Sequence, residues 1–469
     1  MFLGLHPGWW LLIVDWTIRL AALWWIPSRS RPAASRSWLL LVGFVPLLGL
    51  PLYLLLGQPW ISRERRARQA RASERIREAQ ARLAAQRATP DGAGREIAAL
   101  VERLGDFQPM PGNAVELLDD YDDSLRRLVA DIDGATREVH LLYYLMFDDA
   151  VGAAVAEALL RASARGVRCR LLLDTVGAKP GLRAWRKRLQ AGGVGVHAML
   201  PGGLRWRRSG RMDLRNHRKL AVIDRATGYT GSQNLAAPGF VPGFPNRELV
   251  VRVHGPAVTQ LAALFASDWY LETGEALAVE VCAPMPGGGI AQVLPSGPAY
   301  PFENARDAVV ALLQRARRRV VLATPYFVPD DAVLAALRIA ALTGVEVVLV
   351  LSRSNNQTLT AWAQASYFDD LLAAGVRIVR YRSHFLHAKH LSVDDDIALI
   401  GSINLDIRSF ALNAEVGLLS YDPHVVARLH AIEDDCLADS EHVDPAAWAR
   451  RPAWQRTRDG IARLADSLL

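Results

Sequence analysis

The chain has 469 residues, 51% of them hydrophobic, with a mean hydropathy of +0.09; it is long enough for two domains and more apolar than a purely soluble protein. Its three cysteines are scattered without the spacing of a zinc site or a disulfide framework. The formal net charge of +7 suits an anionic partner, without choosing between nucleic acid and anionic lipid.

The N-terminal region, residues 1–60, contains two apolar stretches, Trp9 to Ile26 and Trp38 to Gly57, each near the length that spans a bilayer core. A short connection rich in Pro, Ser and Arg separates them, which predicts a transmembrane helical hairpin. Asp15 and Arg19 lie one helical turn apart in the first stretch, so they could pair there, or this stretch could lie in the interface. No basic segment precedes it and no small-residue cleavage site follows, so we expect both stretches to be retained.

An arginine-rich segment follows, and we expect a basic juxtamembrane helix or linker over residues 61–95. Nine arginines lie between residues 63 and 87, at positions 63, 65, 66, 68, 71, 75, 77, 82 and 87. Such a helix would be attracted to a negatively charged leaflet, and a solvated arginine-rich helix is the alternative. These arginines outnumber the three in the preceding connection, so the positive-inside rule places the rest of the chain in the cytoplasm.

From about Asp91 onward, apolar runs of strand length alternate with helical stretches, as in an α/β protein with covered sheets. The first half predicts strand, helix, strand, helix and strand at 138–147, 150–164, 167–174, 182–191 and 219–223. The second half repeats this order at 320–328, 332–342, 345–351, 362–374 and 376–381, followed by a strand at 387–393. A Pro/Gly cluster, Pro284 to Gly289, predicts a linker between lobes at 96–285 and 286–469.

A polar signature occurs once in each half. His217, Lys219 and Asp224 recur as His387, Lys389 and Asp394. Each copy continues through Gly-Ser-x-Asn and then Asn-x-Glu, which adds Ser232, Asn234 and Glu248 in the first half, and Ser402, Asn404 and Glu415 in the second. One His-x-Lys pair would be weak evidence, whereas two copies that agree at this many positions indicate a single site with two-fold pseudo-symmetry.

The doubled H-x-K-x-x-x-x-D with G-S-x-N resembles the signature of the phospholipase D superfamily. GSINLDIRSFALNAE in the second copy and TPYFVPDD at 324–331 are similar to the cardiolipin synthase branch, and the resemblance extends over nearly the whole chain. It implies an α/β fold of two pseudo-symmetric phospholipase D-like lobes, with mixed sheets flanked by helices and the active site at their interface, preceded by the transmembrane hairpin. The terminal ADSLL departs from the family because it lacks a common proline.

The two histidines can exchange a phosphodiester without a metal. One imidazole would attack phosphorus to give a phosphohistidine, and the other would protonate the leaving alcohol and then deprotonate the incoming one. The resemblance favours His217 as nucleophile and His387 as acid/base.

The other signature residues would support this exchange. We expect Lys219 and Lys389, with Asn234 and Asn404, beside the phosphoryl oxygens. The carboxylates expected to orient the imidazoles are Asp224, Asp394, Glu248 and Glu415, in an undecided pairing. Ser232 and Ser402 would shape the turns or add a hydrogen bond.

Other residues are given ordinary roles. No carboxylate or histidine spacing repeats as a two-metal site would require, and no glycine-rich nucleotide loop follows a strand, so we expect no metal and no other cofactor. His384 and His390 have no counterpart in the first half and are expected at the surface or rim. Tyr144 is expected to be a core aromatic.

The resemblance implies a membrane-bound phosphatidyltransferase that converts two phosphatidylglycerol molecules into cardiolipin and glycerol. We expect a multi-pass protein of the bacterial cytoplasmic (inner) membrane with its catalytic body in the cytoplasm. The alternatives are a phospholipase D-type hydrolase and transfer to another alcohol or to phosphatidylethanolamine, because the same intermediate serves each reaction. The hairpin argues against a nucleic-acid substrate, two complete signatures argue against an inactive scaffold, and the sequence carries no signal for the oligomeric state.

Overall fold

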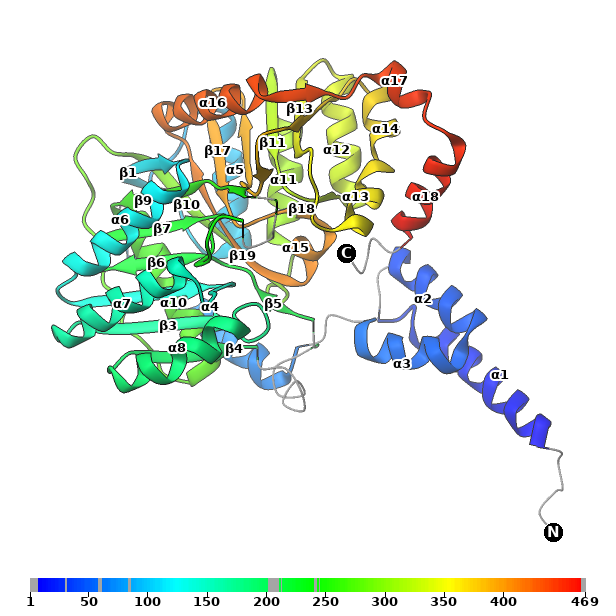
Figure 1. Ribbon diagram of the computed structural model, residues 1–469, viewed down its shortest axis with the longest axis horizontal. Coiled ribbons are helices and arrows are strands. Elements are labelled where there is room, and N and C mark those ends of the chain that lie inside the picture. Colours follow the sequence, from blue (N-terminus) through cyan, green and yellow to red (C-terminus); the bar gives the residue numbers. More distant parts are fainter. Residues whose placement is uncertain are drawn as a thin grey trace, which may run out of the picture. The chain divides into compact units, whose positions relative to one another are not determined.

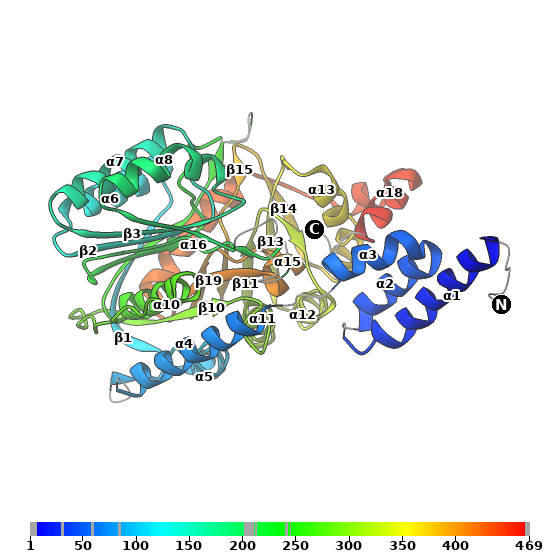
Figure 2. The same ribbon diagram turned by 90° about the horizontal axis from the view of Figure 1, so that it is seen from below.

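The computed structural model describes residues 7–29, 32–57, 61–82, 86–200, 211, 213–239, 243 and 245–464. Two compact units are present, one of Met1–Arg65 with Gly202–Leu214 and one of Arg66–Pro201 with Arg215–Leu469. Figure 1 and Figure 2 show helices in the N-terminal unit and sheets covered by helices in the larger one.

The described part of the N-terminal unit contains α1 (Pro7–Trp25), α2 (Pro32–Phe44) and α3 (Pro46–Leu56). The second predicted apolar stretch is divided, because Val45 leaves the helical conformation and Pro46 begins a new helix. Asp15 and Arg19 pair along α1 at 2.9 Å, one of the two arrangements that their spacing allows. Within the described residues, no helix combines the length and the apolar run needed to cross a membrane.

The arginine-rich segment forms α4 (Arg63–Arg82), which belongs to the larger unit from Arg66 on. Its buried face consists of Gln69, Ala72, Ile76 and Gln80, spaced three and four residues apart. Gln108 donates two hydrogen bonds to Gln80, from its backbone N–H at 3.2 Å and from its side-chain amide at 3.0 Å, and they fasten this face to the body. Most arginines of α4 are exposed on its other side.

The first half of the larger unit contains, in chain order, α5 (Gly92–Gly105), β1 (Met110–Leu118), α6 (Tyr121–Gly134), β2 (Glu138–Tyr143), α7 (Ala150–Ala164), β3 (Arg168–Asp174), α8 (Lys179–Ala191), β4 (Gly195–Met199), β5 (Arg215–Asn216), β6 (Leu220–Ile223), β7 (Thr227–Gly231), β8 (Asn246–Arg247), β9 (Val250–His254) and α10 (Pro256–Thr273). All five elements predicted for this half are present.

The second half contains β10 (Gly289–Ser296), α11 (Asn304–Arg315), β11 (Arg319–Ala323), β12 (Phe327–Val328), α12 (Asp331–Leu342), β13 (Glu346–Ser352), α13 (Thr358–Ala365), α14 (Phe368–Ala373), β14 (Arg377–Tyr381), β15 (Phe385–Leu386), β16 (His390–Val393), β17 (Ile397–Gly401), β18 (Leu405–Asp406), α15 (Ile407–Ala411), β19 (Asn413–Ser420), α16 (Pro423–Ala438), β20 (Ser440–His442), α17 (Pro445–Ala449) and α18 (Ala453–Arg463). The strand predicted at 320–328 is interrupted, because Pro325 has no N–H for the ladder. The helix predicted at 362–374 is two helices.

A mixed sheet joins the two halves and repeats its strand order. The order is β20-β14-β13-β11-β16-β17-β19-β10-β1-β9-β7-β6-β2-β3-β4, so the halves meet where β10 pairs antiparallel with β1. In each half three parallel strands (β2-β3-β4 or β11-β13-β14) are followed by an antiparallel one (β6 or β16). The chain therefore has the mixed α/β architecture that its sequence predicts, with an internal two-fold repeat.

The strands place alternate residues in different hydrophobic cores, as a period of two requires. Val347 and Leu349 of β13 belong to the core under α11 and α12, whereas Val348 and Val350 belong to a central core. The central core draws on both halves and on α10 and α16, and the helices α6, α7 and α8 cover the outer face of the first half (Figure 2). A core shared by both halves holds them as one body.

Candidate active site

The two signatures begin directly after short strands that pair with the opposite half. β5 pairs in parallel with the start of β19, and β15 pairs in the same way with β8. The backbone N–H of His217 donates to the carbonyl of Ala414 at 2.8 Å, and that of His387 donates to the carbonyl of Arg247 at 2.9 Å. Each histidine is thus fixed by the strand that leads to the Asn-x-Glu of the other half.

Each imidazole is held by a glutamate of the other half. Nδ1 of His217 lies 3.0 Å from a carboxylate oxygen of Glu415, and Nδ1 of His387 lies 2.8 Å from both oxygens of Glu248. All four side chains are buried. An ionised carboxylate only accepts hydrogen bonds, so Nδ1 is the protonated nitrogen in both rings and Nε2 is left for chemistry.

The repeated Asn and Ser residues support these glutamates. Asn246 donates to Glu248 at 3.0 Å, and Ser402 donates to Glu415. Burial alone would raise the pKa of Glu248, but the electrostatic interaction and hydrogen bond with His387, together with Lys389, lower it to about 2. The pKa of Glu415 is lowered in the same way, chiefly by His217. Both carboxylates therefore remain ionised at neutral pH.

The imidazoles lie in a dry, cation-rich environment. Burial lowers the pKa of His217, and it lowers that of His387 to about 4. The partner glutamates act in the opposite direction, while Lys219 and Lys389 each lower the pKa of both histidines. The two signatures are electrostatically coupled, and without an anion the neutral imidazoles are favoured.

Lys219 and Lys389 are buried beside the histidines. The Nζ of Lys219 donates to the carbonyl of His217 at 2.7 Å, and Lys389 makes the same contact with His387. Burial lowers the pKa of Lys219 to about 7 and that of Lys389 to about 8, although Glu415 and Glu248 favour the charged forms. A phosphate bound here would stabilise both ammonium groups.

The motif aspartates do not orient the imidazoles, which corrects one expectation. Asp224 and Asp394 occupy left-handed turns, with φ of 50° and 49°. The carboxylate of Asp224 accepts the backbone N–H groups of residues 136, 137 and 138, and that of Asp394 accepts those of 317, 318 and 319. Each aspartate therefore ties the turn after its lysine strand to the start of β2 or β11.

The remaining signature residues lie close to this network. Ser232 exchanges hydrogen bonds with the backbone of Leu249, next to Glu248. The Oδ1 of Asn234 accepts the N–H of Leu145 at 3.2 Å. Asn404 is buried, and its Oδ1 has no hydrogen-bond partner within the described residues.

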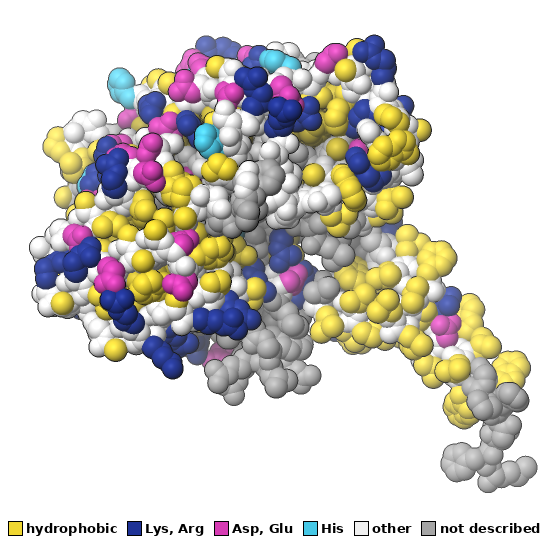
Figure 3. Space-filling view, in the orientation of Figure 1, with side chains coloured by type: hydrophobic (Ala, Val, Ile, Leu, Met, Phe, Trp, Pro, Cys, Tyr) yellow, Lys and Arg dark blue, Asp and Glu magenta, His cyan; other side chains and the backbone are white. Residues whose placement is uncertain are grey.

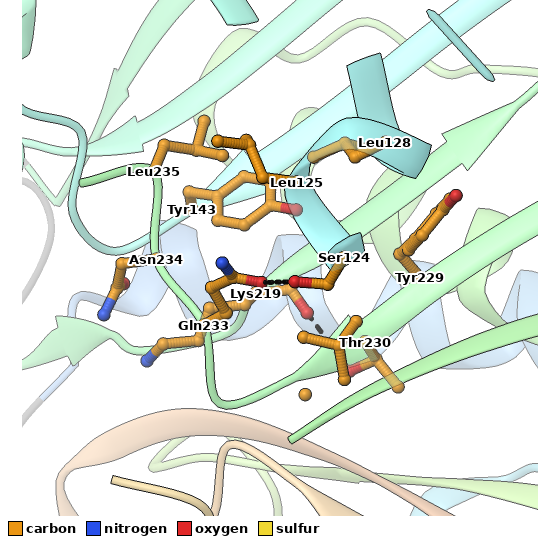
Figure 4. A pocket seen from close by; sticks show the side chains of 12 residues that line it. Ser124, Leu125, Leu128, Tyr143, Lys219, Tyr229, Thr230, Gln233, Asn234 and Leu235 are labelled. Carbon is orange, nitrogen blue, oxygen red and sulfur yellow. Dashed lines mark hydrogen bonds between the residues drawn. The ribbon is translucent and has the colours of Figure 1, made fainter. Parts of the chain in front are cut away.

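A small cavity adjoins Lys219. Figure 4 shows this lysine among Ser124, Tyr143, Gln233 and Thr230, between α6 and the sheet; the volume is about 20 Å³. A cavity of the same volume adjoins Lys389 in the second half. The internal repeat therefore extends to the space around each lysine.

Three groups, two of them buried and Tyr144 half-buried, were missed or misread in the sequence. Tyr144, expected only in the core, packs edge-on against His217 with ring centroids 4.8 Å apart, and its ring centroid lies 5.4 Å from the Nζ of Lys219. Arg218 is buried and bonds to Asp268 of the first half and to the backbone of Glu415 of the second. His390, expected at the surface or rim, is buried beside Glu433 at 3.4 Å. His390 begins a strand, His390–Val393, that lies inside the sheet. A position in such a strand could have predicted that this histidine is buried.

Within the described residues, His, Cys, Asp and Glu side chains form no group of three that could hold a metal ion. Two imidazoles, each held by a carboxylate of the other half, share the electrostatic influence of Lys219 and Lys389. A doubled lobe with this interlocked His-Lys-Glu arrangement defines a phospholipase D-type enzyme.

Comparison with known proteins agrees with this class. The family model described as "Cardiolipin synthase, PLD-like domain" matches residues 128–269 and 309–435. The chain is 32% identical to cardiolipin synthase A of Salmonella arizonae over 482 residues, and 33% identical to that of Edwardsiella ictaluri over 477 residues. Each alignment covers 98% of this chain and 97% of the relative. The chain therefore belongs to the family of phospholipase D-like cardiolipin synthases.

A solved structure also shares the fold. The crystal structure of phosphatidylserine synthase from Haemophilus influenzae matches with a TM-score of 0.58 at 13% identity, over 80% of this chain and 100% of that one. At this identity the likeness concerns the two-lobed fold alone.

Proposed function

We propose that this chain is a cardiolipin synthase that transfers a phosphatidyl group from one phosphatidylglycerol to another, giving cardiolipin and glycerol. The observation that carries the proposal is the pair of cross-half contacts, His217 with Glu415 and His387 with Glu248. Each contact holds Nδ1 and leaves Nε2 for the reaction, and both rings feel the charges of Lys219 and Lys389, which supports a double displacement at phosphorus.

In the first half-reaction, Nε2 of His217 attacks phosphorus of phosphatidylglycerol. A P–N bond forms and the P–O bond to the headgroup glycerol breaks. His387, protonated on Nε2, gives this proton to the leaving alkoxide, so that glycerol departs neutral. Lys219 and Lys389 stabilise the charge on the non-bridging oxygens.

In the second half-reaction, neutral His387 removes the proton from a headgroup hydroxyl of the second phosphatidylglycerol. The oxygen attacks phosphorus, a new P–O bond forms and the P–N bond to His217 breaks. Cardiolipin leaves, and both histidines return to their starting protonation. The lowered pKa of His387, caused first by burial, suits the base in this step, and a bound anionic lipid raises that pKa for the acid step.

The N-terminal helices support a location in the bacterial cytoplasmic membrane. Large side chains are exposed on all sides of α1, among them the consecutive Trp9, Trp10, Leu11 and Leu12, and Asp15 is paired with Arg19. A helix that is apolar on all sides suits lipid. We propose a multi-pass anchor in residues 1–60, the basic helix of 61–95 at the cytoplasmic surface, and lobes 96–285 and 286–469 in the cytoplasm.

The test is a product assay on the full chain reconstituted in vesicles that contain labelled phosphatidylglycerol, with and without a chelator. Equal amounts of cardiolipin and glycerol, insensitive to the chelator, are expected. Phosphatidic acid as the sole lipid product would identify a hydrolase. A product that requires added phosphatidylethanolamine or another alcohol would identify a different acceptor, and loss of activity with the chelator would contradict the metal-free mechanism.

A further inference from the structure

Helix α18 lies at the C-terminal end of the described chain and packs against α13 with one face. Asp459 and Ala462 are its buried residues. Arg458 donates to Asp459 at 2.7 Å, and Arg451 lies 3.5 Å from the same carboxylate. The helix is therefore fixed to the body.

The opposite face of α18 is apolar and exposed. Trp454 is 61% exposed, Ile461 is 63% exposed and Leu464, next to the helix end, is 79% exposed. Their spacing of seven and three residues places them along one side of a helix. Leu359 of the adjoining α13 is 43% exposed as well. Such a row of large side chains marks an interaction surface.

This surface is surrounded by arginines. Residues 450–464 contain five arginines and one aspartate, and the aspartate is the buried Asp459. Arg458 lies over the rings of Trp362 and Trp454, at 4.9 and 5.4 Å, and Arg463 lies over Tyr367 at 4.3 Å. Figure 3 shows hydrophobic and basic side chains together over α17 and α18. Aromatic and aliphatic groups among arginines are typical of helices that lie at a membrane surface.

We propose that α18 is an interfacial helix that inserts Trp454, Ile461 and Leu464 among the headgroups of an anionic bilayer. Two other occupants fit less well. A symmetric contact with a second copy would bring two arginine clusters together, and a nucleic acid would leave the exposed apolar row without a partner. The inference rests on the proposed membrane location and gives the catalytic body a contact with lipid separate from the N-terminal helices.

The test uses spin labels on the full chain in vesicles of phosphatidylglycerol and phosphatidylcholine. Cysteine replaces Ile461 in one variant and Arg456 in a matched control, since Arg456 is exposed two residues from Trp454 and so on another side of the helix. Both variants carry Cys282→Ser, so that the spin label reacts only at the introduced cysteine. The other two cysteines, Cys169 and Cys436, are buried and need no replacement. The ratio of oxygen to nickel-chelate accessibility should be at least about threefold higher at 461 than at 456, and the difference should shrink in pure phosphatidylcholine.

Each other outcome overturns the inference in a recognisable way. Equal, water-like accessibility at both positions, in vesicles that still make cardiolipin, refutes the role of α18 and leaves the proposed function intact. Loss of access to both reagents with spin–spin broadening identifies contact with a second copy. Protein that stays out of the vesicles or forms no cardiolipin is a failure of the proposed function itself.

Discussion

Glu415, on β19 of the second half, accepts a hydrogen bond from Nδ1 of His217, in the first half, at 3.0 Å. In the same way, Glu248 of the first half accepts a hydrogen bond from Nδ1 of His387, in the second half. Neither half contains a complete His–Glu pair, because the carboxylate that sets each imidazole comes from the other half. Both copies of the signature are therefore needed to set both imidazoles, and the core shared by the two halves keeps the partners in register.

Replacing Glu415 with Gln should lower kcat roughly 10²- to 10³-fold with little change in KM. The amide can turn its NH2 group, a donor, toward Nδ1, and because the amide is neutral it no longer stabilises the imidazolium. The measurement is cardiolipin formation in vesicles, with thermal unfolding as the check on folding. Glu248→Gln should act similarly on the other histidine. A turnover within threefold of the parent in both variants would contradict the positioning role.

The nucleophile can be assigned by trapping. His387→Ala should still form a covalent phosphatidyl-histidine on His217 when offered a substrate with a good leaving group, because such a group needs no proton. His217→Ala should form none. Acid-labile, alkali-stable label on a peptide containing residue 217 is the readout, and label at residue 387 would reverse the assignment.

The repeated sequence located the histidines, lysines and glutamates, and strand-length apolar runs located the strands that carry them. The pairing of each glutamate was not accessible from sequence, because partners 198 and 139 residues apart are joined through two-residue strands too short to leave a periodic signal. Asp224 and Asp394 were misread for a related reason. A conformation with positive φ and three backbone N–H contacts has no signature that distinguishes it from a catalytic carboxylate.

Replacing Asp224 with Ala should destabilise the protein by roughly 1–3 kcal/mol, since backbone N–H groups lose their acceptor. Turnover per folded molecule should stay within about threefold. Unfolding by denaturant measures the change in stability, and titration of active sites gives the turnover per folded molecule. A fall in kcat of about 100-fold without a change in stability would restore Asp224 to the catalytic apparatus.

The lysines should limit activity at high pH. Burial lowers the pKa of Lys219 to about 7 and that of Lys389 to about 8, so the free enzyme loses ammonium charge as pH rises through this range. The measured kcat/KM should therefore decline above about pH 7–8. Lys219→Arg retains its charge and should leave only the limb from Lys389, at higher pH. An unchanged limb in this variant would assign the decline to another group.

Removal of the charge at Lys219 should stabilise the fold. The folded-state pKa of about 7 lies below the ordinary value of 10.5, so folding opposes protonation, and the resulting destabilisation is largest below pH 7 and disappears as pH rises toward 10.5. Lys219→Met should be inactive, yet more stable at pH 7 by roughly 1–3 kcal/mol. The gain should shrink when unfolding is measured at pH 9.5, and a loss of stability at pH 7 would contradict this account.

Substitution of Arg218 tests whether a contact between the halves affects catalysis as well as folding. Arg218 is buried, pairs with Asp268 of α10, and donates to the backbone carbonyl of Glu415 at 3.0 Å and to that of Ser296 at 2.9 Å. Arg218→Met alone should cost about 3–5 kcal/mol, because Asp268 is left buried without its partner. Adding Asp268→Leu removes that charge and should restore most of the stability. The double variant should still show kcat reduced about tenfold, since the strand that carries Glu415 has lost its cross-half donor. If the double variant keeps the kcat of the parent while its stability is restored, Arg218 has a purely structural role. In that case the single variant Asp268→Asn, which keeps a polar partner for Arg218, should also have the kcat of the parent.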